Sequence, residues 1–161
     1  MEHCIIRIDD RLIHGQVIVG WVHRLNLKHI VIVNDGICKN AMRQRLMMMA
    51  VPDDIEIDFM DLKQFVAAMK KATDNKKKGC IILFESAQDV VRSVKSGAPI
   101  KRVNVGGLHY QEGKTQLAPF LSVDDEDVKA LKFLMKKDIE LEGRALPLDE
   151  KVDVGNLLEG K

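Results

Sequence analysis

One histidine stands between a predicted strand and a predicted helix near the start of the chain. Residues 7–17 are RIDDRLIHGQV, with apolar residues 4–6 before them and the amphipathic stretch 17–22 at their end. His14 therefore falls at the carboxyl edge of a strand and beside a helix N-terminus, where open α/β sheets bind ligands and anions. The guanidinium of Arg11 lies three residues upstream. Together these groups favour chemistry on a phosphoryl group.

This histidine loop meets the main requirements of phosphoryl transfer. An unprotonated imidazole, which the ordinary histidine pKa of about 6.5 allows at neutral pH, can attack phosphorus. Donors must then stabilise the charge that spreads over the phosphoryl oxygens. The planar fork of Arg11 suits those oxygens, and Gly15 lets the backbone approach them without a Cβ. Asp9 and Gln16 are the near candidates for fixing the imidazole tautomer. Asp10 is expected to hold Arg11 when no phosphoryl group is bound.

The composition is that of one ordinary globular domain, spanning residues 1–161. Of the 161 residues, 46% are hydrophobic and 30% charged, and the net charge is +1. This charge excludes a global field that steers the chain to nucleic acid. No apolar run approaches the roughly 18 residues of a membrane span, and no signal peptide pattern opens the chain. We therefore expect a cytoplasmic protein.

The metal-ligating residue types show no metal-site spacing. The five histidines and three cysteines match no zinc or disulfide pattern. Cys4 and Cys80 fall inside predicted strands and are interpreted as small, buried free thiols. The sequence therefore predicts no metal site.

Apolar runs alternate with amphipathic stretches along the chain. Two runs are continuously apolar, as expected for strands covered on both faces. Apolar spacing predicts helices over residues 62–69, after Ser86, and after Asp124, with both of these residues as N-caps. We expect the polar tail to fray after about Val154. The predicted strands are residues 4–8, 30–33, 55–59, 80–84 and 102–105, with a short final strand around 139–141.

This alternation predicts a single-domain α/β fold with a parallel sheet and helices on both faces. The carboxyl ends of the strands then share one rim of the sheet. That rim receives polar or glycine-rich strand ends, whose proximity depends on the strand order: His14, Asn34 with Asp35, Glu85 with Ser86, and Gly106 with Gly107.

Other segments have mainly structural interpretations. The lysine run 76–78 is predicted to be a solvated turn, and the methionine-rich stretch 46–49 to be core or a helix face. The glycines at 106 and 107 are expected to shape a rim loop. Residues 109 and 110 fit either a partner contact or plain packing. Exposure of residue 12 or 13 would suit a transient interface.

Two other α/β readings of the histidine loop are weaker. Histidine phosphatases place an arginine directly before the nucleophile, whereas Ile13 stands there in this chain. A nucleotide-binding domain is disfavoured because no G-x-G-x-x-G or Walker sequence is present.

The histidine loop resembles the phosphorylation-site segment of the mannose/fructose/sorbose family of phosphotransferase-system (PTS) enzyme IIB components. The R-I-D-x-R-L-I-H-G-Q run is specific, and the resemblance covers nearly the whole length. The matching segments are RIDDRLIHGQV at 7–17, VIVND at 31–35, NVGGLHY at 104–110 with GK at 113–114, VDDEDV at 123–128, and residues 143–147.

This resemblance implies a phosphocarrier. The histidine matching His14 accepts a phosphoryl group on Nδ1 from a IIA component, and the residues matching Arg11 and Asp9 support the site. The group passes to a sugar held by the membrane components IIC and IID, with which the protein associates peripherally. No metal or diffusible cofactor is needed. The family fold is a mostly parallel sheet with helices on both faces and an antiparallel edge strand.

Two expectations about partners follow from the resemblance. Because the matching segment begins at the first residues, we expect IIA to be a domain of another chain. The alternative function is a phosphorylation-dependent regulatory or interaction module that is not coupled directly to transport.

Overall fold

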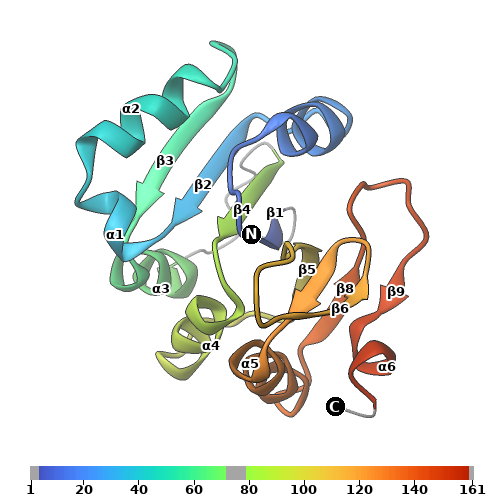
Figure 1. Ribbon diagram of the computed structural model, residues 1–161. Coiled ribbons are helices and arrows are strands. Elements are labelled where there is room, and N and C mark those ends of the chain that lie inside the picture. The colour runs from blue at the N-terminus through green and yellow to red at the C-terminus, as the bar shows by residue number, and fades with distance from the viewer. Residues whose placement is uncertain (1–3, 72–78, 160–161) are drawn as a thin grey trace.

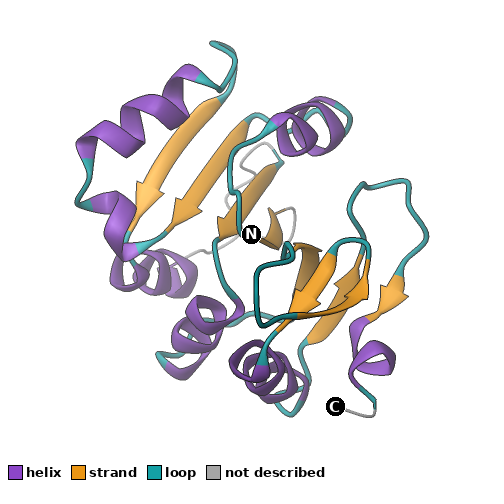
Figure 2. Ribbon diagram, viewed as in Figure 1, coloured by secondary structure: helices purple, strands orange, loops and turns teal. Residues whose placement is uncertain are grey.

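The computed structural model describes residues 4–71 and 79–159. Within these ranges seven strands form one sheet in the order β3-β2-β4-β1-β5-β8-β9, with helices on both faces (Figures 1 and 2). Its strands pair in parallel except β9, which runs antiparallel to β8. The α/β class and the antiparallel edge strand are confirmed. The strands are β1 (Cys4–Asp9), β2 (His29–Val33), β3 (Glu56–Met60), β4 (Cys80–Phe84), β5 (Arg102–Gly107), β8 (Glu140–Gly143) and β9 (Val152–Asp153).

The helices cover two separate hydrophobic clusters on opposite faces of the sheet. Alternate residues of β4 show this division, because Ile81 and Leu83 join one cluster whereas Ile82 and Phe84 join the other. The first cluster lies under η1, and the second lies under α3, α4, α5 and α6. The helices are η1 (Gln16–His23), which is a π-helix, α1 (Asp35–Cys38), α2 (Ala41–Met49), α3 (Leu62–Lys71), α4 (Ala87–Lys95), α5 (Asp125–Met135) and α6 (Val154–Leu158).

Both predicted N-caps are confirmed. The side chain of Ser86 accepts a hydrogen bond from the backbone of Asp89 at the start of α4. Asp124 and Asp127 form a reciprocal capping box at the start of α5, in which each side chain satisfies a backbone N–H that the helix leaves free. These caps fix where the helices begin.

The prediction that Cys4 and Cys80 are free thiols is wrong. Strands β1 and β4 pair so that these residues are direct neighbours, 4.5 Å apart at Cα, and they form a disulfide. The two cysteines are 76 positions apart in sequence, so their proximity depends on a strand order that spacing alone does not reveal. Cys38 is the free cysteine of the described residues.

The C-terminal region also differs from the prediction. The predicted fraying after about Val154 is wrong for residues 154–158, because β9 pairs with β8 and α6 buries Val154 and Leu158. The antiparallel hairpin of β6 (Thr115–Ala118) and β7 (Leu121–Val123) was not predicted. It is short and lacks a clear alternating pattern.

Two further segments, residues 46–49 and 76–78, had structural predictions. The methionine-rich stretch 46–49 was predicted to be core or a helix face. It lies on helix α2, in which none of the described residues is buried, so it is a helix face and not core. The lysine run 76–78 lies outside the described residues. Among those that are described, no helix is both long and apolar enough to cross a bilayer.

Candidate active site

A buried ion pair lies at the carboxyl end of β1. Arg7 and Asp9 are both fully buried, and Asp9 Oδ2 accepts hydrogen bonds from Arg7 Nη2 at 2.8 Å and Nε at 3.2 Å. Arg7 Nη1 also donates to Asn104 Oδ1 on β5 and to the carbonyl of Arg144. A buried charge without such partners would be very costly. The pair therefore fixes the position of the Asp9 carboxylate.

The two glycines of β5 make room for this ion pair. A Cβ on Gly106 would overlap the guanidinium of Arg7, and one on Gly107 would lie 3.0 Å from the Asp9 carboxylate. Both glycines belong to β5 itself, so the expectation of a rim loop is wrong for them. Their role is to let two polar side chains of β1 lie against the neighbouring backbone.

The imidazole of His14 hydrogen-bonds this anchored carboxylate. His14 Nε2 lies 3.0 Å from Asp9 Oδ2, and the His14 side chain is 15% exposed. With Nε2 protonated towards the carboxylate, the lone pair is on Nδ1. Nδ1 has no hydrogen-bond partner among residues 4–71 and 79–159. The ring is therefore held at one nitrogen and available at the other, and it is not sealed in the core.

The same contacts set the protonation of Asp9. Burial raises the pKa of its carboxyl, but the hydrogen bond from His14 and the charge of Arg7 outweigh burial, so the pKa is lowered overall. Asp9 is thus a carboxylate at neutral pH. It can stabilise positive charge that develops on the imidazole, as the aspartate of a catalytic triad does.

A strained residue shapes the loop between β1 and η1. Leu12 has φ of 55°, in the left-handed region that leucine rarely adopts, yet its side chain is almost fully buried. Such strain costs about 1–3 kcal/mol and persists only where packing enforces it. Leu12 is therefore an anchor in the core, so of the pair Leu12 and Ile13 it is not the residue available to a transient interface. Ile13 is partly buried against the same cluster.

The other predicted residues of the loop are accessible. Arg11 is exposed, and no described residue forms an ion pair or hydrogen bond with its guanidinium. A Cβ on Gly15 would have no atom within 4 Å, so the space in front of the η1 N-terminus is open. Gln16 begins η1 and does not contact Asp9 in a hydrogen bond. The tautomer is therefore fixed by Asp9 and not by Gln16.

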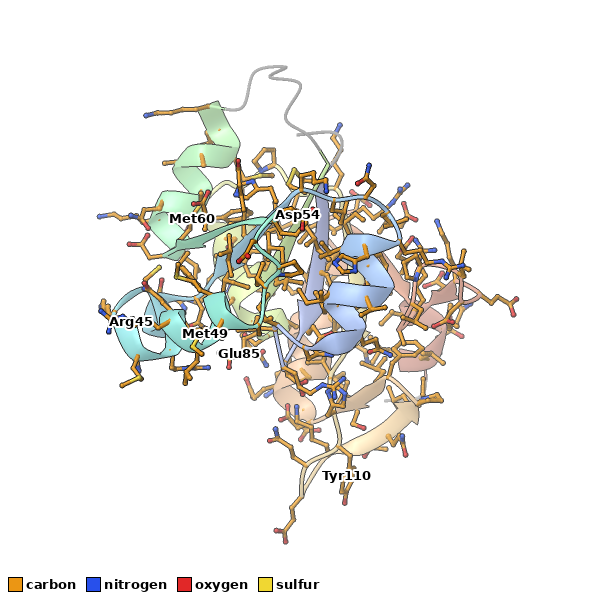
Figure 3. All side chains as sticks on the ribbon, turned by 90° about the horizontal axis from the view of Figure 1, so that it is seen from above. Arg45, Met49, Asp54, Met60, Glu85 and Tyr110 are labelled. Carbon is orange, nitrogen blue, oxygen red and sulfur yellow. A yellow bond between two sulfur atoms is a disulfide. The ribbon has the colours of Figure 1, made fainter. Side chains whose placement is uncertain are left out.

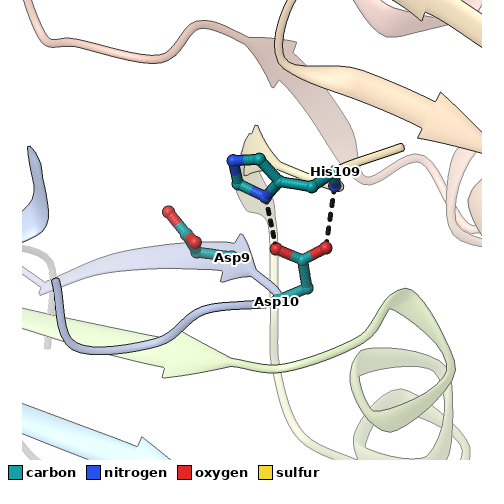
Figure 4. Close-up of side chains that lie close together, drawn as sticks. All are labelled: Asp9, Asp10 and His109. Carbon is teal, nitrogen blue, oxygen red and sulfur yellow. Dashed lines mark hydrogen bonds and ion pairs between the residues drawn. The ribbon is translucent and has the colours of Figure 1, made fainter. Parts of the chain in front are cut away.

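Asp10 has a different partner from the one predicted. Its two oxygens accept hydrogen bonds from the backbone N–H of His109 at 2.7 Å and from the His109 ring at Nδ1 (Figure 4). Asp10 N–H also donates to the carbonyl of Gly107. Asp10 thus attaches the histidine loop to the segment after β5, and it does not hold Arg11.

Asp9, Asp10 and His109 have ligand atoms within 4.8 Å of one another. Such a group is a conceivable metal site. However, the carboxylates of Asp9 and Asp10 already accept hydrogen bonds from Arg7, His14 and His109. The hydrogen-bonding needs of the cluster are therefore met by protein groups.

Asp35, the remaining predicted rim residue, belongs to another cluster. Its oxygens accept from the backbone of Leu62 at 2.9 Å and from Arg92 at 2.7 Å. These contacts lower the pKa of Asp35, the backbone hydrogen bond first and the arginine second. Strand β4 separates β2 from β1, so the rim carries two clusters, and Asp35 does not join the one around His14.

Arg7 and its surroundings were not among the site residues predicted from the sequence. The guanidinium of Arg7 lies 4.9 Å from the centre of the Trp21 ring, and Arg144 approaches the same ring at 5.4 Å. Trp21 also donates from Nε1 to the carbonyl of Ala145. A usable signal existed, because a lone arginine inside an apolar strand needs both a counter-charge and space. Asp9 and the glycine pair supply them.

The arrangement around His14 thus joins a nucleophilic nitrogen, a buried carboxylate behind the ring and a free cation on an open loop. The comparisons with known proteins agree with a phosphotransferase component. The family model of the PTS system sorbose subfamily IIB component matches residues 3–161. The chain belongs to this family.

Individual relatives support this assignment. The PTS system fructose-specific EIIB component of Bacillus subtilis is 34% identical over 161 residues, covering 98% of this chain and 96% of that protein. The mannose-specific EIIAB component of Escherichia coli is 37% identical over 155 residues. The match covers 94% of this chain and only 47% of that longer relative.

A solved structure shows the same fold. The IIBSor domain of the sorbose permease from Klebsiella pneumoniae superimposes with a TM-score of 0.84 at 31% identity, covering 96% of this chain and 94% of that one. The chain is therefore a sugar-specific PTS IIB component by family and fold.

Proposed function

We propose that this protein is a IIB phosphocarrier that accepts a phosphoryl group from a phosphorylated IIA component on His14. It then passes the group to a sugar held by the membrane components IIC and IID. The observation that supports this most directly is the His14 ring, which is fixed at Nε2 by the buried Asp9 and open at Nδ1. The first transfer forms a bond from Nδ1 to phosphorus while the bond from phosphorus to the donor nitrogen breaks.

Each surrounding group has a part in this step. The carboxylate of Asp9 keeps the proton on Nε2 and stabilises the positive ring that results when Nδ1 binds phosphorus. Arg11 donates to the phosphoryl oxygens, whose charge is the main quantity to be stabilised. Amides at the start of η1 beside Gly15 add smaller support. Gln16, which follows Gly15, is the first residue of this helix.

In the second transfer His14 is the donor of the phosphoryl group. A sugar hydroxyl oxygen attacks phosphorus, the bond to Nδ1 breaks, and the hydroxyl proton leaves to a base or solvent. His14 returns to the neutral tautomer that Asp9 favours. The acceptor sugar is expected to be selected by the membrane components and not by this chain.

Phosphorylation in vitro tests the proposal. The purified protein is treated with phosphoramidate, a small phosphoryl donor, and with the phosphorylated IIA portion of the E. coli mannose-specific relative. Base-stable, acid-labile phosphate is then mapped by mass spectrometry. His14→Gln is expected to abolish labelling, and His29→Gln, which changes a similarly buried histidine, is the matched control. Label that persists in His14→Gln, or that never reaches His14 from either donor, contradicts the proposal.

A further inference from the structure

Helix α2 presents an apolar face that nothing in the described chain covers. Its inner side is attached through Gln44, whose Nε2 donates to the carbonyls of Ile37 and Cys38, and through the partly buried Met47. Its outer side carries large apolar residues that are 61–83% exposed. We name this side the α2 outer face, made up of Met42, Arg45, Leu46 and Met49, which follow the i, i+3, i+4, i+7 spacing of one helix face.

The composition of α2 indicates the chemistry of its partner. The helix contains two arginines and no carboxylate. Arg45 is the charged residue of the α2 outer face, and a second copy of the chain would bring two Arg45 side chains together across a two-fold axis, so self-association is disfavoured. The apolar faces of bilayer-bound helices commonly carry Trp or Phe besides Leu, and residues 41–49 contain neither, so a protein partner is favoured over a bilayer. Methionine and arginine are both enriched in protein interfaces. The composition therefore favours an acidic, apolar protein surface.

The position of α2 connects it with the site. Arg43 at its amino end pairs with Glu85 at 3.5 Å, and Glu85 accepts a hydrogen bond from Asn34 at 2.6 Å. Glu85 directly follows β4, which pairs with β1, so the amino end of α2 lies at the rim that carries His14. Figures 1 and 3 show α2 at the β3 edge of the molecule, with Arg45 and Met49 on it.

The distances allow one partner to cover both places. β3 is three strand positions from β1, which corresponds to roughly 14 Å across the sheet. A standard interface of about 800 Å² per partner is roughly 30 Å across. This spacing is compatible with one protein that contacts both His14 and α2.

We propose that the α2 outer face is a docking surface for the acidic protein that delivers the phosphoryl group to His14. This inference rests on the proposed function. Methionine side chains adapt to a partner's shape, and Arg45 meets its carboxylates. The surface supplies affinity and orientation, and the chemistry remains at His14.

Two variants test this surface without disturbing the core, because no side chain of α2 is buried in the described structure. The first is M42Q/L46Q/M49Q, which keeps helix-forming residues, and the second is R45E. The charge control is K136E, at an exposed position just after α5. Each protein is phosphorylated by the phosphorylated IIA portion of the E. coli mannose-specific relative and, in parallel, by phosphoramidate.

Both α2 variants are expected to lower kcat/KM with the IIA donor by about tenfold or more, and K136E is not. Labelling by phosphoramidate is expected to be unchanged in all of them. Added salt should slow the wild type more than R45E. Unchanged kinetics with the IIA donor, an equal loss with both donors, or a loss confined to transfer from His14 to the membrane components would overturn the inference.

The outcomes separate this inference from the proposed function. Wild-type protein that is labelled at His14 by both donors, with unaffected α2 variants, contradicts the docking surface alone. Wild-type protein that the IIA donor does not label contradicts the relay itself and, with it, the docking surface.

Discussion

Two histidines of this protein make almost the same contact with an aspartate, yet only one stands in a setting for chemistry. His14 Nε2 lies 3.0 Å from Asp9, and His29 Nε2 lies 2.9 Å from Asp58. Their side chains are 15% and 13% exposed. Distance and exposure of the imidazole therefore do not distinguish the two pairs.

The two pairs differ in the burial of the aspartate and in the groups that surround it. Asp9 is fully buried and is paired with the buried Arg7, whereas Asp58 is 56% exposed. Moreover, His29 begins β2 at the amino end of the strands, away from the rim where η1 begins and Arg11 is free. A histidine–aspartate pair thus becomes a candidate site here because a buried charge fixes it and an open, cationic loop faces it.

The largest expected effect is a loss of stability on removal of Asp9, compared with removal of Asp58. Asp9→Ala leaves Arg7 buried without its counter-charge, which should cost about 3–5 kcal/mol of unfolding free energy. Asp58→Ala breaks an exposed pair and should cost no more than about 1 kcal/mol. Urea unfolding of both variants measures the two costs. Equal losses would contradict the comparison, and Asp9→Asn provides a milder change if Asp9→Ala does not fold.

The arginine facing His14 should matter for transfer and not for stability. Arg11 is exposed, and charge-assisted hydrogen bonds to phosphoryl oxygens contribute about 1.5–3 kcal/mol, against about 0.3–1 kcal/mol for the helix dipole. Arg11→Ala should therefore slow labelling of His14 by roughly 10- to 150-fold, with an unchanged urea midpoint. An unchanged labelling rate would show that the arginine does not act on the phosphoryl group.

The glycines near the site should respond in opposite ways. Gly106→Ala places a Cβ in the space occupied by the Arg7 guanidinium, and such overpacking costs about 1–3 kcal/mol. Gly15→Ala meets open space and should leave stability within about 0.5 kcal/mol. Thermal unfolding measures both. A stable Gly106→Ala variant would indicate that Arg7 can move aside, and the buried anchor would then be less rigid than described.

The attachment of the loop by Asp10 should have a smaller effect. Asp10→Asn weakens the hydrogen bonds to His109 without removing the side chain, so a loss of about 1 kcal/mol is expected. Amide hydrogen exchange of residues 10–15 should rise, while exchange in α3 should not. Unchanged exchange in the loop would contradict its attachment to the segment after β5.

The pH dependence of stability should report on the buried carboxylate of Asp9. The pKa of Asp9 is lowered in the folded protein, so its contribution to stability is present above the ordinary carboxyl pKa of about 3.9 and is lost as the pH falls below it. Wild-type stability should thus fall more steeply than that of Asp9→Asn on acidification below about pH 4. Parallel curves for the two proteins would contradict this.

The sequence was enough to predict the sheet and the histidine loop, because both depend on local patterns. Continuous apolar runs indicated the parallel strands, and the order of residue types placed His14 between a strand and a helix. The surroundings of Arg7 and the partner of Asp10 depended on which strands adjoin. Arg7 with Gly106, Asp10 with His109, and Cys4 with Cys80 all come together only because β1 lies between β4 and β5.

Two further outcomes depend on geometry that the pattern of residue types does not reveal. Of the two residues whose exposure would have suited a transient interface, Leu12 is buried, because its backbone adopts a left-handed conformation that turns the side chain into the core. Asp35 lies on the predicted rim, but two strands from β1, and it stabilises α3 and Arg92 instead. Position on a rim is therefore weaker evidence for a site than the buried group behind it.

Identification of the phosphorylated nitrogen would show whether Asp9 holds His14 at Nε2 and leaves Nδ1 open to phosphorus. Protein labelled with ¹⁵N at histidine and phosphorylated by phosphoramidate is observed by ¹⁵N and ³¹P NMR, with His14→Gln and His29→Gln for assignment. We expect phosphate on Nδ1 of His14, with the proton of Nε2 retained and directed to Asp9. Phosphate on Nε2 of His14, or on His29 in place of His14, would contradict it.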